Sequence, residues 1–333
     1  MKLEQIGFYS LSDKRACNAC ETSQMKRCEM IITEYCNFCC PYCRGLKDEI
    51  YGNRIKKQLT LEEIKHNIDL WCQNNPLENI RFSGGEPTYH PHLLEGVAYA
   101  KAQGIKRIAI STNGSNKFEK YTQLIEAGVN DFSISLDACC AEDGDKMAGG
   151  IRGAWDRVIK NIRALSPLTY ITVGIVLTPD NIRGCINTIR MAHNLGVADI
   201  RVISAAQWNR SIKELGEIEQ EILDAHPILK YRVKNFMIGR NVRGITGDDY
   251  HKCPLVLDDT VIAGDYFFPC VIYMREQGKP IGKVASDMRS KQKVWFEQHN
   301  TFEDPICKKN CLDVCIDYNN KWRQLHEKKI NNA

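Results

Sequence analysis

Near its start the chain carries the stretch Thr33-Glu34-Tyr35-Cys36-Asn37-Phe38-Cys39-Cys40-Pro41-Tyr42-Cys43, in which Cys36, Cys40 and Cys43 follow the spacing C-x3-C-x2-C. Cubane iron–sulfur clusters usually take four thiolates, one per iron. A compact loop with three thiolates would leave one iron open to a small molecule. Ile31 and Ile32 predict a strand directly before the loop, and barrel enzymes place their chemistry at the C-terminal ends of strands. The stretch therefore indicates a metal-dependent active site.

A structural zinc site is the alternative interpretation of these clustered cysteines. Zinc sites usually show two C-x2-C pairs, or mixtures of cysteine and histidine. Cys17 and Cys20 form a further C-x2-C pair ahead of the loop. Zinc therefore stays open when the loop is considered alone.

The composition is that of an ordinary globular chain. It has 333 residues, of which 43% are hydrophobic and 26% charged, enough for one large domain and a smaller one. No apolar stretch approaches the roughly 20 residues of a membrane span, and the first residues do not resemble a secretory signal. Sixteen cysteines then indicate thiolate ligands in a reducing cytoplasm rather than disulfides. The net charge of +4 is too small to indicate nucleic-acid binding by itself.

Six short segments with strand character alternate with helical segments between about residues 28 and 225. Several are rich in Ile and Val, which is typical of strands that are buried on both faces of a parallel sheet. The predicted strands are Glu29–Thr33, Asn79–Phe82, Arg107–Ser111, Asp131–Leu136, Tyr170–Leu177 and Asp199–Ile203.

The segments between these strands show the helical spacing of apolar residues. Thr60 and Glu63 form a predicted capping box ahead of the first of these helices. The predicted helices are Leu61–Trp71, Pro91–Gln103, Lys117–Ala127, Ala154–Ala164 and Asn181–Leu195. Strict alternation of this kind predicts a parallel α/β sheet, which is either open and doubly wound or a partial barrel.

A glycine-rich segment, Ser83-Gly84-Gly85-Glu86-Pro87, follows the second predicted strand. Two glycines allow the backbone to approach a ligand closely, and a carboxylate beside them suits an ammonium group. Taken alone, the segment is explained equally well as a turn at a strand end. Together with the cysteine loop about 40 residues upstream, however, the segment becomes a specific indication of a ligand-binding site.

The cysteine loop, with Tyr42 just before Cys43, and the Gly84-Gly85-Glu86-Pro87 segment resemble the signatures of the radical S-adenosylmethionine (radical SAM) superfamily. The resemblance is close over residues 28–205 and loose over 250–318. It implies a partial (β/α)6 TIM barrel with a small cysteine-rich C-terminal domain. The implied division is an N-terminal arm (1–27), the barrel (28–225), a bridge (226–249) and an auxiliary cluster domain with a basic tail (250–333).

The resemblance also implies a [4Fe–4S] cluster that binds S-adenosylmethionine (SAM) through its open iron, with the three loop cysteines as ligands. Gly84, Gly85 and Glu86 would hold the amino group of SAM. Residues at the ends of later strands would border SAM or the substrate, namely Ser111, Asn113, Ser135, Asp137, Asn181 and Arg201. For single Ser, Asn and Asp residues, a cap or turn role is an equally good explanation.

Cys139 and Cys140 follow Asp137 at the end of the fourth predicted strand. If the barrel forms, this position lies on its catalytic rim, where one thiol at most would face the cavity and donate a hydrogen atom to a substrate radical. Packing is the simpler role for both.

Five further cysteines gather towards the C-terminus, at Cys253, Cys270, Cys307, Cys311 and Cys315. They resemble, more loosely, the shortened "twitch" form of the SPASM domain, which carries an auxiliary [4Fe–4S] cluster. Four thiolates would suffice, and the sequence does not choose between Cys311 and Cys315. A four-cysteine zinc site is the alternative. The remaining N-terminal cysteines are interpreted as structural: Cys17, Cys20 and Cys28.

The expected function is that of a cytoplasmic radical SAM enzyme that acts on a peptide or small molecule, by oxidation, cross-linking or rearrangement. A flavodoxin- or ferredoxin-like protein would supply the electron. Modification or isomerisation of a nucleotide or nucleic-acid base is the alternative within the superfamily. A non-catalytic zinc-binding protein is the alternative of another class, and it leaves the Gly84–Glu86 segment unexplained.

Overall fold

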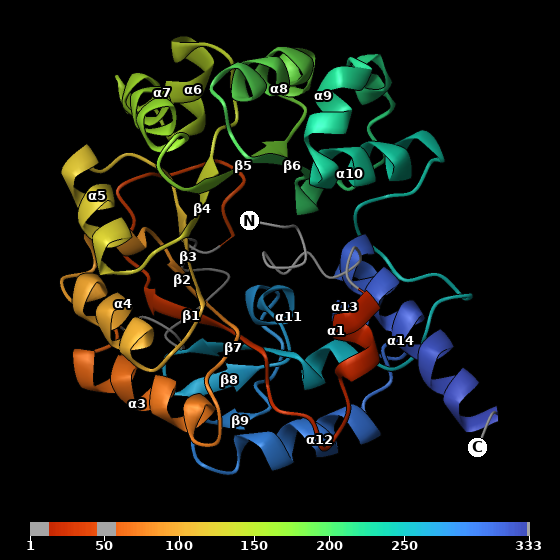
Figure 1. The fold of residues 1–333 in the computed structure, drawn as a ribbon. Coiled ribbons are helices and arrows are strands. Elements are labelled where there is room, and N and C mark those ends of the chain that lie inside the picture. Colours follow the sequence, from red (N-terminus) through yellow and green to blue (C-terminus); the bar gives the residue numbers. More distant parts are fainter. Residues whose placement is uncertain (1–12, 45–57, 332–333) are drawn as a thin grey trace.

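The computed structural model describes residues 13–44 and 58–331. Six parallel strands curve into an open crescent, β1 beside β2 and so on to β6 (Figure 1). The crescent does not close, which confirms the predicted partial barrel. Its strands are β1 (Arg27–Thr33), β2 (Asn79–Gly84), β3 (Arg107–Thr112), β4 (Asp131–Ser135), β5 (Tyr170–Leu177) and β6 (Asp199–Ser204).

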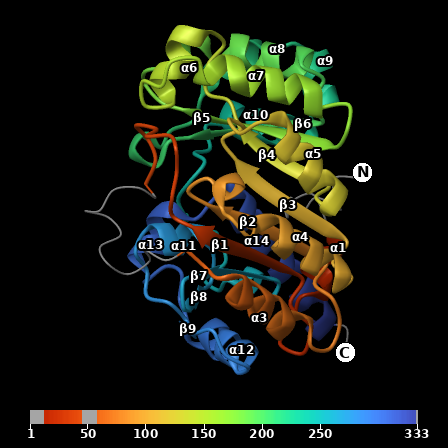
Figure 2. The same ribbon diagram turned by 90° about the vertical axis from the view of Figure 1, so that its left-hand side faces the viewer.

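Helices cover the convex side of the crescent, as Figure 1 shows. The capping box at Thr60 and Glu63 forms as predicted, with both reciprocal hydrogen bonds present. These helices are α3 (Leu61–Cys72), α4 (Leu93–Ala102), α5 (Phe118–Ala127), α6 (Ala141–Met147), α7 (Ala154–Leu165), α8 (Cys185–Asn194), α9 (Gln220–Ala225) and α10 (Pro227–Met237). Figure 2 shows α6, α7 and α8 at one end of the curved sheet.

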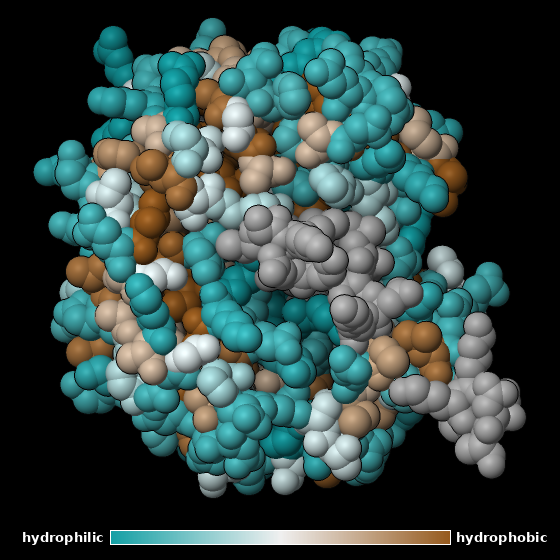
Figure 3. Space-filling view, viewed as in Figure 1, coloured by the Kyte–Doolittle hydropathy of each residue, from teal (hydrophilic) through white to brown (hydrophobic). Residues whose placement is uncertain are grey.

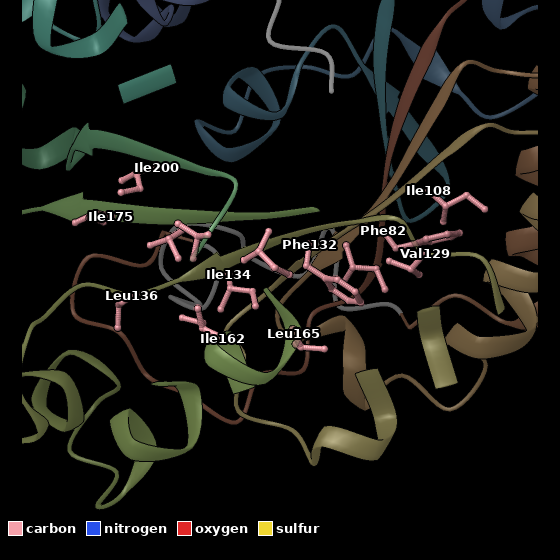
Figure 4. Packing of buried hydrophobic residues seen from close by; sticks show 14 of the residues in the cluster. Phe82, Ile108, Val129, Phe132, Ile134, Leu136, Ile162, Leu165, Ile175 and Ile200 are labelled. Atoms are coloured by element: carbon pink, nitrogen blue, oxygen red, sulfur yellow. The ribbon is translucent and has the colours of Figure 1, made fainter. Parts of the chain in front are cut away.

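The main core lies between the strands and these helices. Phe82 of β2 and Phe132 of β4 are completely buried, together with Ile162 and Leu165 of α7 (Figure 4). Burying one such side chain contributes about 1.5–3 kcal/mol. The apolar face of each strand therefore fixes the outer helices, and it leaves the concave face of the crescent to polar residues such as Arg81 and Arg201.

The C-terminal region extends the same sheet. β7 (Asp259–Ala263) pairs in parallel with β1, and β8 (Tyr266–Phe268) and β9 (Gly282–Lys283) continue it antiparallel. Helices lie beside these strands, and the last of these helices is the longest (Figure 1). They are α11 (Val271–Arg275), α12 (Met288–Gln298), α13 (Pro305–Asn310) and α14 (Asp313–Asn331).

The N-terminal helix α1 (Asp13–Asn18) packs against α14. Ala16 and Ala19 are buried against Leu255 and Tyr318, and the Trp322 indole donates a hydrogen bond to the Ala19 carbonyl at 2.7 Å. The two ends of the described chain are thus held together on the C-terminal side of the molecule.

The predicted strands and helices are present, with boundary shifts of one or two residues at most of them. Two local features differ from the sequence-based expectation. Helix α6 was missed, and the predicted helix Asn181–Leu195 divides into a 3-10 turn (Ile182–Gly184) followed by α8. The turn follows because the Asn181 side chain accepts a hydrogen bond from the Thr178 N–H and so closes a local loop.

The division of the chain into arm, barrel, bridge and auxiliary domain stays a prediction. Within the bridge, α10 packs against β6, and its Ile228 N–H donates to the buried Asp199 carboxylate at 3.2 Å. No helix in the described parts of the chain is both long and apolar enough to cross a membrane.

Candidate cofactor site at the cysteine loop

The cysteine loop begins where β1 ends, and the Gly84–Glu86 segment holds its first residues. The Gly85 N–H donates to the Thr33 carbonyl at 2.8 Å, and the Glu86 N–H donates to the Tyr35 carbonyl at 2.7 Å. A Cβ atom on Gly85 would lie 2.2 Å from the Tyr35 oxygen, and one on Gly84 only 2.0 Å from the Thr33 oxygen. Gly84 also has a φ of +149°. Both glycines are therefore required by the close approach of two chain segments.

The Glu86 carboxylate lies inside the protein, with none of its surface exposed. Its Oε1 accepts from the Thr88 N–H at 3.1 Å, the Thr88 hydroxyl at 2.6 Å and the Thr112 hydroxyl at 2.7 Å. Its Oε2 accepts from the Asn113 N–H at 2.6 Å. Burial raises the pKa of Glu86, and these donors counteract the shift. The carboxylate thus joins the ends of β2 and β3, and its predicted contact with SAM stays a prediction.

Asn113 connects this carboxylate to the cysteine loop. Its side-chain amide donates to Asn37 at 2.9 Å and lies 3.9 Å from the Cys36 sulfur. Asn37 in turn donates to the Ser115 hydroxyl at 2.9 Å. A continuous polar network therefore runs from the buried Glu86 to the first predicted cluster ligand.

The three loop cysteines surround one region. The pKa of Cys36 is raised to about 11 and that of Cys40 to about 12, mainly by burial and in part by neighbouring carboxylates and cysteines. The Phe38 N–H donates to the Cys36 sulfur at 3.4 Å. Buried thiols of this kind ionise when a metal binds them.

Among the residues that the structure describes, the loop sulfurs are not gathered as tightly as three ligands of one metal ion would be. Thiolates bound to one zinc ion at about 2.3 Å would lie about 3.8 Å apart. In the described residues, no three cysteine sulfurs lie within 4.8 Å of one another. A cubane cluster, with an iron at each corner, requires a wider spacing. A cavity of about 170 Å³ adjoins Cys36, Cys43, Gly84 and Gly85.

Tyr42 and Asp137 close one side of the loop. The Tyr42 hydroxyl donates to Asp137 Oδ2 at 2.5 Å, and the Val176 N–H donates to Oδ1 at 2.7 Å. Burial raises the pKa of Asp137 to about 6, and these two hydrogen bonds counteract the shift. Cys40, Asn113 and Ser135 line a smaller cavity of about 60 Å³ beside this pair.

The other residues predicted to border SAM or the substrate divide into two groups. Ser111 and Arg201 lie on the concave face of the sheet, where Ser111 accepts a hydrogen bond from Arg81 at 3.2 Å and Arg201 donates one to Ser133 at 3.3 Å. Asn181 is buried and donates to the carbonyls of Asp137 and Val176 at 2.9 and 2.8 Å. Asn181 therefore connects the ends of β4 and β5.

Cys139 and Cys140 lie after β4, as expected, but neither is among the residues that line the two cavities at the cysteine loop. The exposed Cys140 precedes α6 and donates to Asp143 at 3.4 Å. Cys139 faces Gly184, since a Cβ added there would lie 3.6 Å from its sulfur. Hydrogen-atom donation by either thiol stays a prediction.

The five C-terminal cysteines form a second group. The thiols interact electrostatically with one another, and burial raises the pKa of Cys253 to about 12. Three sulfurs have N–H neighbours: Asn319 donates to Cys253 at 3.8 Å, the Tyr273 N–H donates to Cys270 at 3.3 Å, and a His299 ring nitrogen lies 3.4 Å from Cys307. Such bonds are typical partners of metal-bound thiolates. Cys311 and Cys315 both stay candidates for the fourth ligand.

The sequence analysis missed His299 and Asp304. The His299 ring nitrogen, an Asp304 oxygen and the Cys307 sulfur lie within 4.8 Å of one another. Tyr273 donates to Asp304 at 2.8 Å, and Asp304 caps α13 through the Cys307 N–H at 2.9 Å. The sequence does contain a signal for Asp304, because Asp304-Pro305 is a typical start of a helix. This helix start positions Cys307.

The N-terminal cysteines have separate surroundings. Cys28 is completely buried in the main core, and Cys17 and Cys20 lie at and after α1. The Cys20 sulfur lies 3.2 Å from the Thr22 hydroxyl. Their structural role stays a prediction.

Comparison with known proteins gives a family and several relatives. Residues 30–192 match the radical SAM superfamily. The chain is similar to the GTP 3′,8-cyclase of Synechococcus elongatus, with 33% identity over 130 residues, which are 39% of each chain. It is similar to the mycofactocin maturase MftC of Mycobacterium tuberculosis, with 26% identity over 230 residues, 67% of this chain and 55% of that protein. The chain thus spans between 39% and 55% of the length of these two relatives.

The fold has a counterpart among solved structures. The crystal structure of Streptococcus suis SuiB bound to S-adenosylmethionine is similar, with a TM-score of 0.56 and 16% identity over 86% of this chain and 67% of that one. At this identity the similarity concerns the architecture, which is a partial barrel.

We expect Gly85→Ala to displace the cysteine loop, because its Cβ would lie 2.2 Å from the Tyr35 carbonyl oxygen. The purified variant should bind less iron than the wild type and lose at least about tenfold in SAM affinity, a loss of about 1.4 kcal/mol. Gly247→Ala is the matched control, since a Cβ there meets no atom within 4 Å. Wild-type iron content and SAM affinity in Gly85→Ala would show that the close approach is not required.

Glu86→Gln should destabilise the protein by about 1–3 kcal/mol, because its amide would place a donor against a buried N–H donor. The thermal melting midpoint, measured anaerobically, should fall. SAM affinity is measured on the same variant. An unchanged melting midpoint with weaker SAM binding would indicate that the carboxylate acts on SAM directly instead of through the ends of β2 and β3.

Proposed function

Because residues 30–192 belong to the radical SAM superfamily, we propose that the protein is an enzyme that abstracts a hydrogen atom from a peptide or small-molecule substrate. When bound, the [4Fe–4S] cluster and SAM supply the chemistry, which is reductive cleavage of SAM to methionine and a 5′-deoxyadenosyl radical. The substrate is then oxidised, cross-linked or rearranged. The observation that carries the proposal is the cysteine loop, tied to the end of β2 beside a cavity.

The loop residues hold the cofactor in this proposal. Cys36, Cys40 and Cys43 bind three irons, and the Phe38 N–H and the Asn113 amide support the Cys36 sulfur. The fourth iron is left to SAM. Because the loop is anchored to β1 and β2, these cysteines would hold the cluster beside the cavity that Cys36 and Cys43 line.

Backbone and polar groups at the strand ends orient SAM. Gly84 and Gly85 line the same cavity as Cys36 and Cys43, so their backbone borders the region where the amino acid part of SAM binds. Ser135 and Asp137 lie beside Cys40 in the smaller cavity. Asn113 and Asn181 act indirectly. Asn113 holds the cysteine loop in place through Asn37, and Asn181 holds Asp137 through its carbonyl.

The C-terminal cysteines hold an auxiliary [4Fe–4S] cluster in this proposal. Cys253, Cys270 and Cys307 are joined by Cys311 or Cys315, and three of these sulfurs already have N–H neighbours. Cys315 also lines a cavity on the concave side of the sheet, so the auxiliary group adjoins the substrate region. It either binds the substrate or accepts the electron that remains after bond formation.

Relatives support two substrate classes. MftC is named as a maturase and SuiB was crystallised with a precursor peptide, whereas another relative is a GTP cyclase. A peptide or small molecule is our first choice, and a nucleotide is the alternative. We further propose a flavodoxin- or ferredoxin-like electron donor and a reducing cytoplasm, in which sixteen cysteines persist without forming disulfides.

Replacing Cys36, Cys40 and Cys43 together with Ala should abolish 5′-deoxyadenosine formation. A smaller iron complement should remain on the C-terminal cysteines, because the two thiolate groups are separate. Iron analysis and 5′-deoxyadenosine assays on the same anaerobic preparations test this.

Cys39→Ala is the matched control, because Cys39 lies in the same loop with its side chain exposed. It should retain iron and activity. If the triple variant loses all of its iron, the proposal of an auxiliary cluster on the C-terminal cysteines is wrong. If it still forms 5′-deoxyadenosine, the assignment of the three ligands is wrong.

A further inference from the structure

The concave side of the sheet holds a cavity of about 220 Å³ that is rich in arginine. It shares Ile203 and three arginines with the cavity at the cysteine loop, so the two adjoin. Only two carboxylates, Glu29 and Asp131, are among its lining residues. Its arginines are Arg27, Arg44, Arg81, Arg201, Arg232, Arg243 and Arg275. The face shown in Figure 3 is hollowed near its centre, and the visible part of the hollow is hydrophilic.

Four of the seven arginines have carboxylate partners within the fold. The pairs are Arg27–Asp259 at 2.6 Å, Arg232–Asp313 at 2.5 Å, Arg81–Asp131 at 3.5 Å, and Arg44–Glu276. These arginines have a structural explanation, because each neutralises an acidic group.

The other three arginines lack such a partner. Across residues 13–44 and 58–331, no carboxylate lies within ion-pair distance of Arg201, Arg243 or Arg275. Arg201 donates to Ser133 at 3.3 Å, and Arg243 makes one long bond of 3.5 Å to the Asn310 carbonyl. The cavity therefore carries an excess of positive charge, including three arginines without an ion-pair partner in the described parts of the chain, next to the proposed site of hydrogen abstraction.

Without a bound anion, this excess of positive charge destabilises the folded protein. Arg243 is only 6% exposed, and its Nε has no hydrogen-bond partner. The pKa of Arg201 and that of Arg243 are lowered to about 10, mainly by burial and in part by neighbouring arginines. A buried cation without a counter-ion is strongly unfavourable, because it loses its hydration without an opposite charge in exchange. A bound anion would remove most of that cost.

The three arginines come from different parts of the fold. Arg201 lies on β6, Arg243 follows α10, and Arg275 ends α11. Guanidinium groups that approach from separate segments suit an anion with oxygens in several directions and more than one charge. A phosphate or diphosphate meets this description, because a single carboxylate has one charge and two oxygens in one plane.

We propose that this cavity binds the phosphate groups of a small-molecule substrate, through Arg243 and Arg275 with Arg201 as the third cation. The proposal rests on the proposed function. With its phosphate in the arginine-rich cavity, the substrate extends its carbon skeleton into the adjoining cavity at Cys36 and Cys43.

The test is calorimetric titration of the full-length, anaerobically reconstituted protein with inorganic pyrophosphate, in the presence of saturating SAM. Phosphate and succinate are titrated in parallel. Pyrophosphate should bind at least about tenfold more tightly than succinate. Arg243→Gln and Arg275→Gln should each weaken pyrophosphate binding about tenfold or more, which corresponds to the strength of a charge-assisted hydrogen bond.

Arg163→Gln is the control, because Arg163 is exposed on the outer helix α7. It should bind pyrophosphate as the wild type does. Circular dichroism and iron content establish that each variant is folded, and Arg243→Lys should recover part of the affinity if charge is what matters.

Three results would overturn the proposal. They are no pyrophosphate binding by protein that still forms 5′-deoxyadenosine, tighter binding of succinate than of pyrophosphate, and competition between pyrophosphate and SAM. The last would show that the arginines serve the SAM carboxylate. Absence of 5′-deoxyadenosine formation would instead count against the proposed function, so the two failures are distinguishable.

Discussion

Two backbone hydrogen bonds at the ends of β1 and β2 determine where the cysteine loop lies. They run from Gly85 to the Thr33 carbonyl and from Glu86 to the Tyr35 carbonyl. They form only because residues 84 and 85 are glycines. A Cβ atom at either position would lie about 2 Å from a carbonyl oxygen of the other segment. The buried Glu86 carboxylate then fixes the end of β3 to the same point. The candidate cofactor site is thus built at the carboxyl ends of β1, β2 and β3.

The second constraint is charge burial. Both groups of thiols and the arginines on the concave face are partly or fully removed from water, and burial opposes ionisation in each case. The thiols gain from binding a metal as thiolates, and the unpartnered arginines gain from binding an anion. Cys315 and Arg243 line one cavity, so at least one of the C-terminal cysteines adjoins the region that we propose binds an anion.

Much of the architecture was predictable from the sequence. The short apolar strands and the capping box at Thr60 and Glu63 specify the barrel elements, since periodicity and caps are local signals. The pairing of β7 with β1 was not predictable, because it joins residues more than 200 positions apart. Helix α6 was missed because its sequence, Ala141–Met147, is short and polar.

The candidate site was predictable in its residue types but not in their contacts. The glycines at 84 and 85 were expected to admit a ligand, which stays a prediction, and the structure shows that they also admit the neighbouring chain segment. Glu86 was expected to face SAM, which stays a prediction, and its four hydrogen bonds to neighbouring protein groups were not predicted. The arginine-rich cavity gave no signal at all, because its members are scattered from residue 27 to 275 and only the folded chain brings them together.

The central claim is that the loop at Cys36, Cys40 and Cys43 supports the reductive cleavage of SAM. The most direct test is to quantify 5′-deoxyadenosine by mass spectrometry after anaerobically reconstituted protein is reduced with dithionite and mixed with SAM. We predict that 5′-deoxyadenosine accumulates to at least one equivalent per protein. Protein with a full complement of iron that binds SAM but forms no 5′-deoxyadenosine would contradict the account.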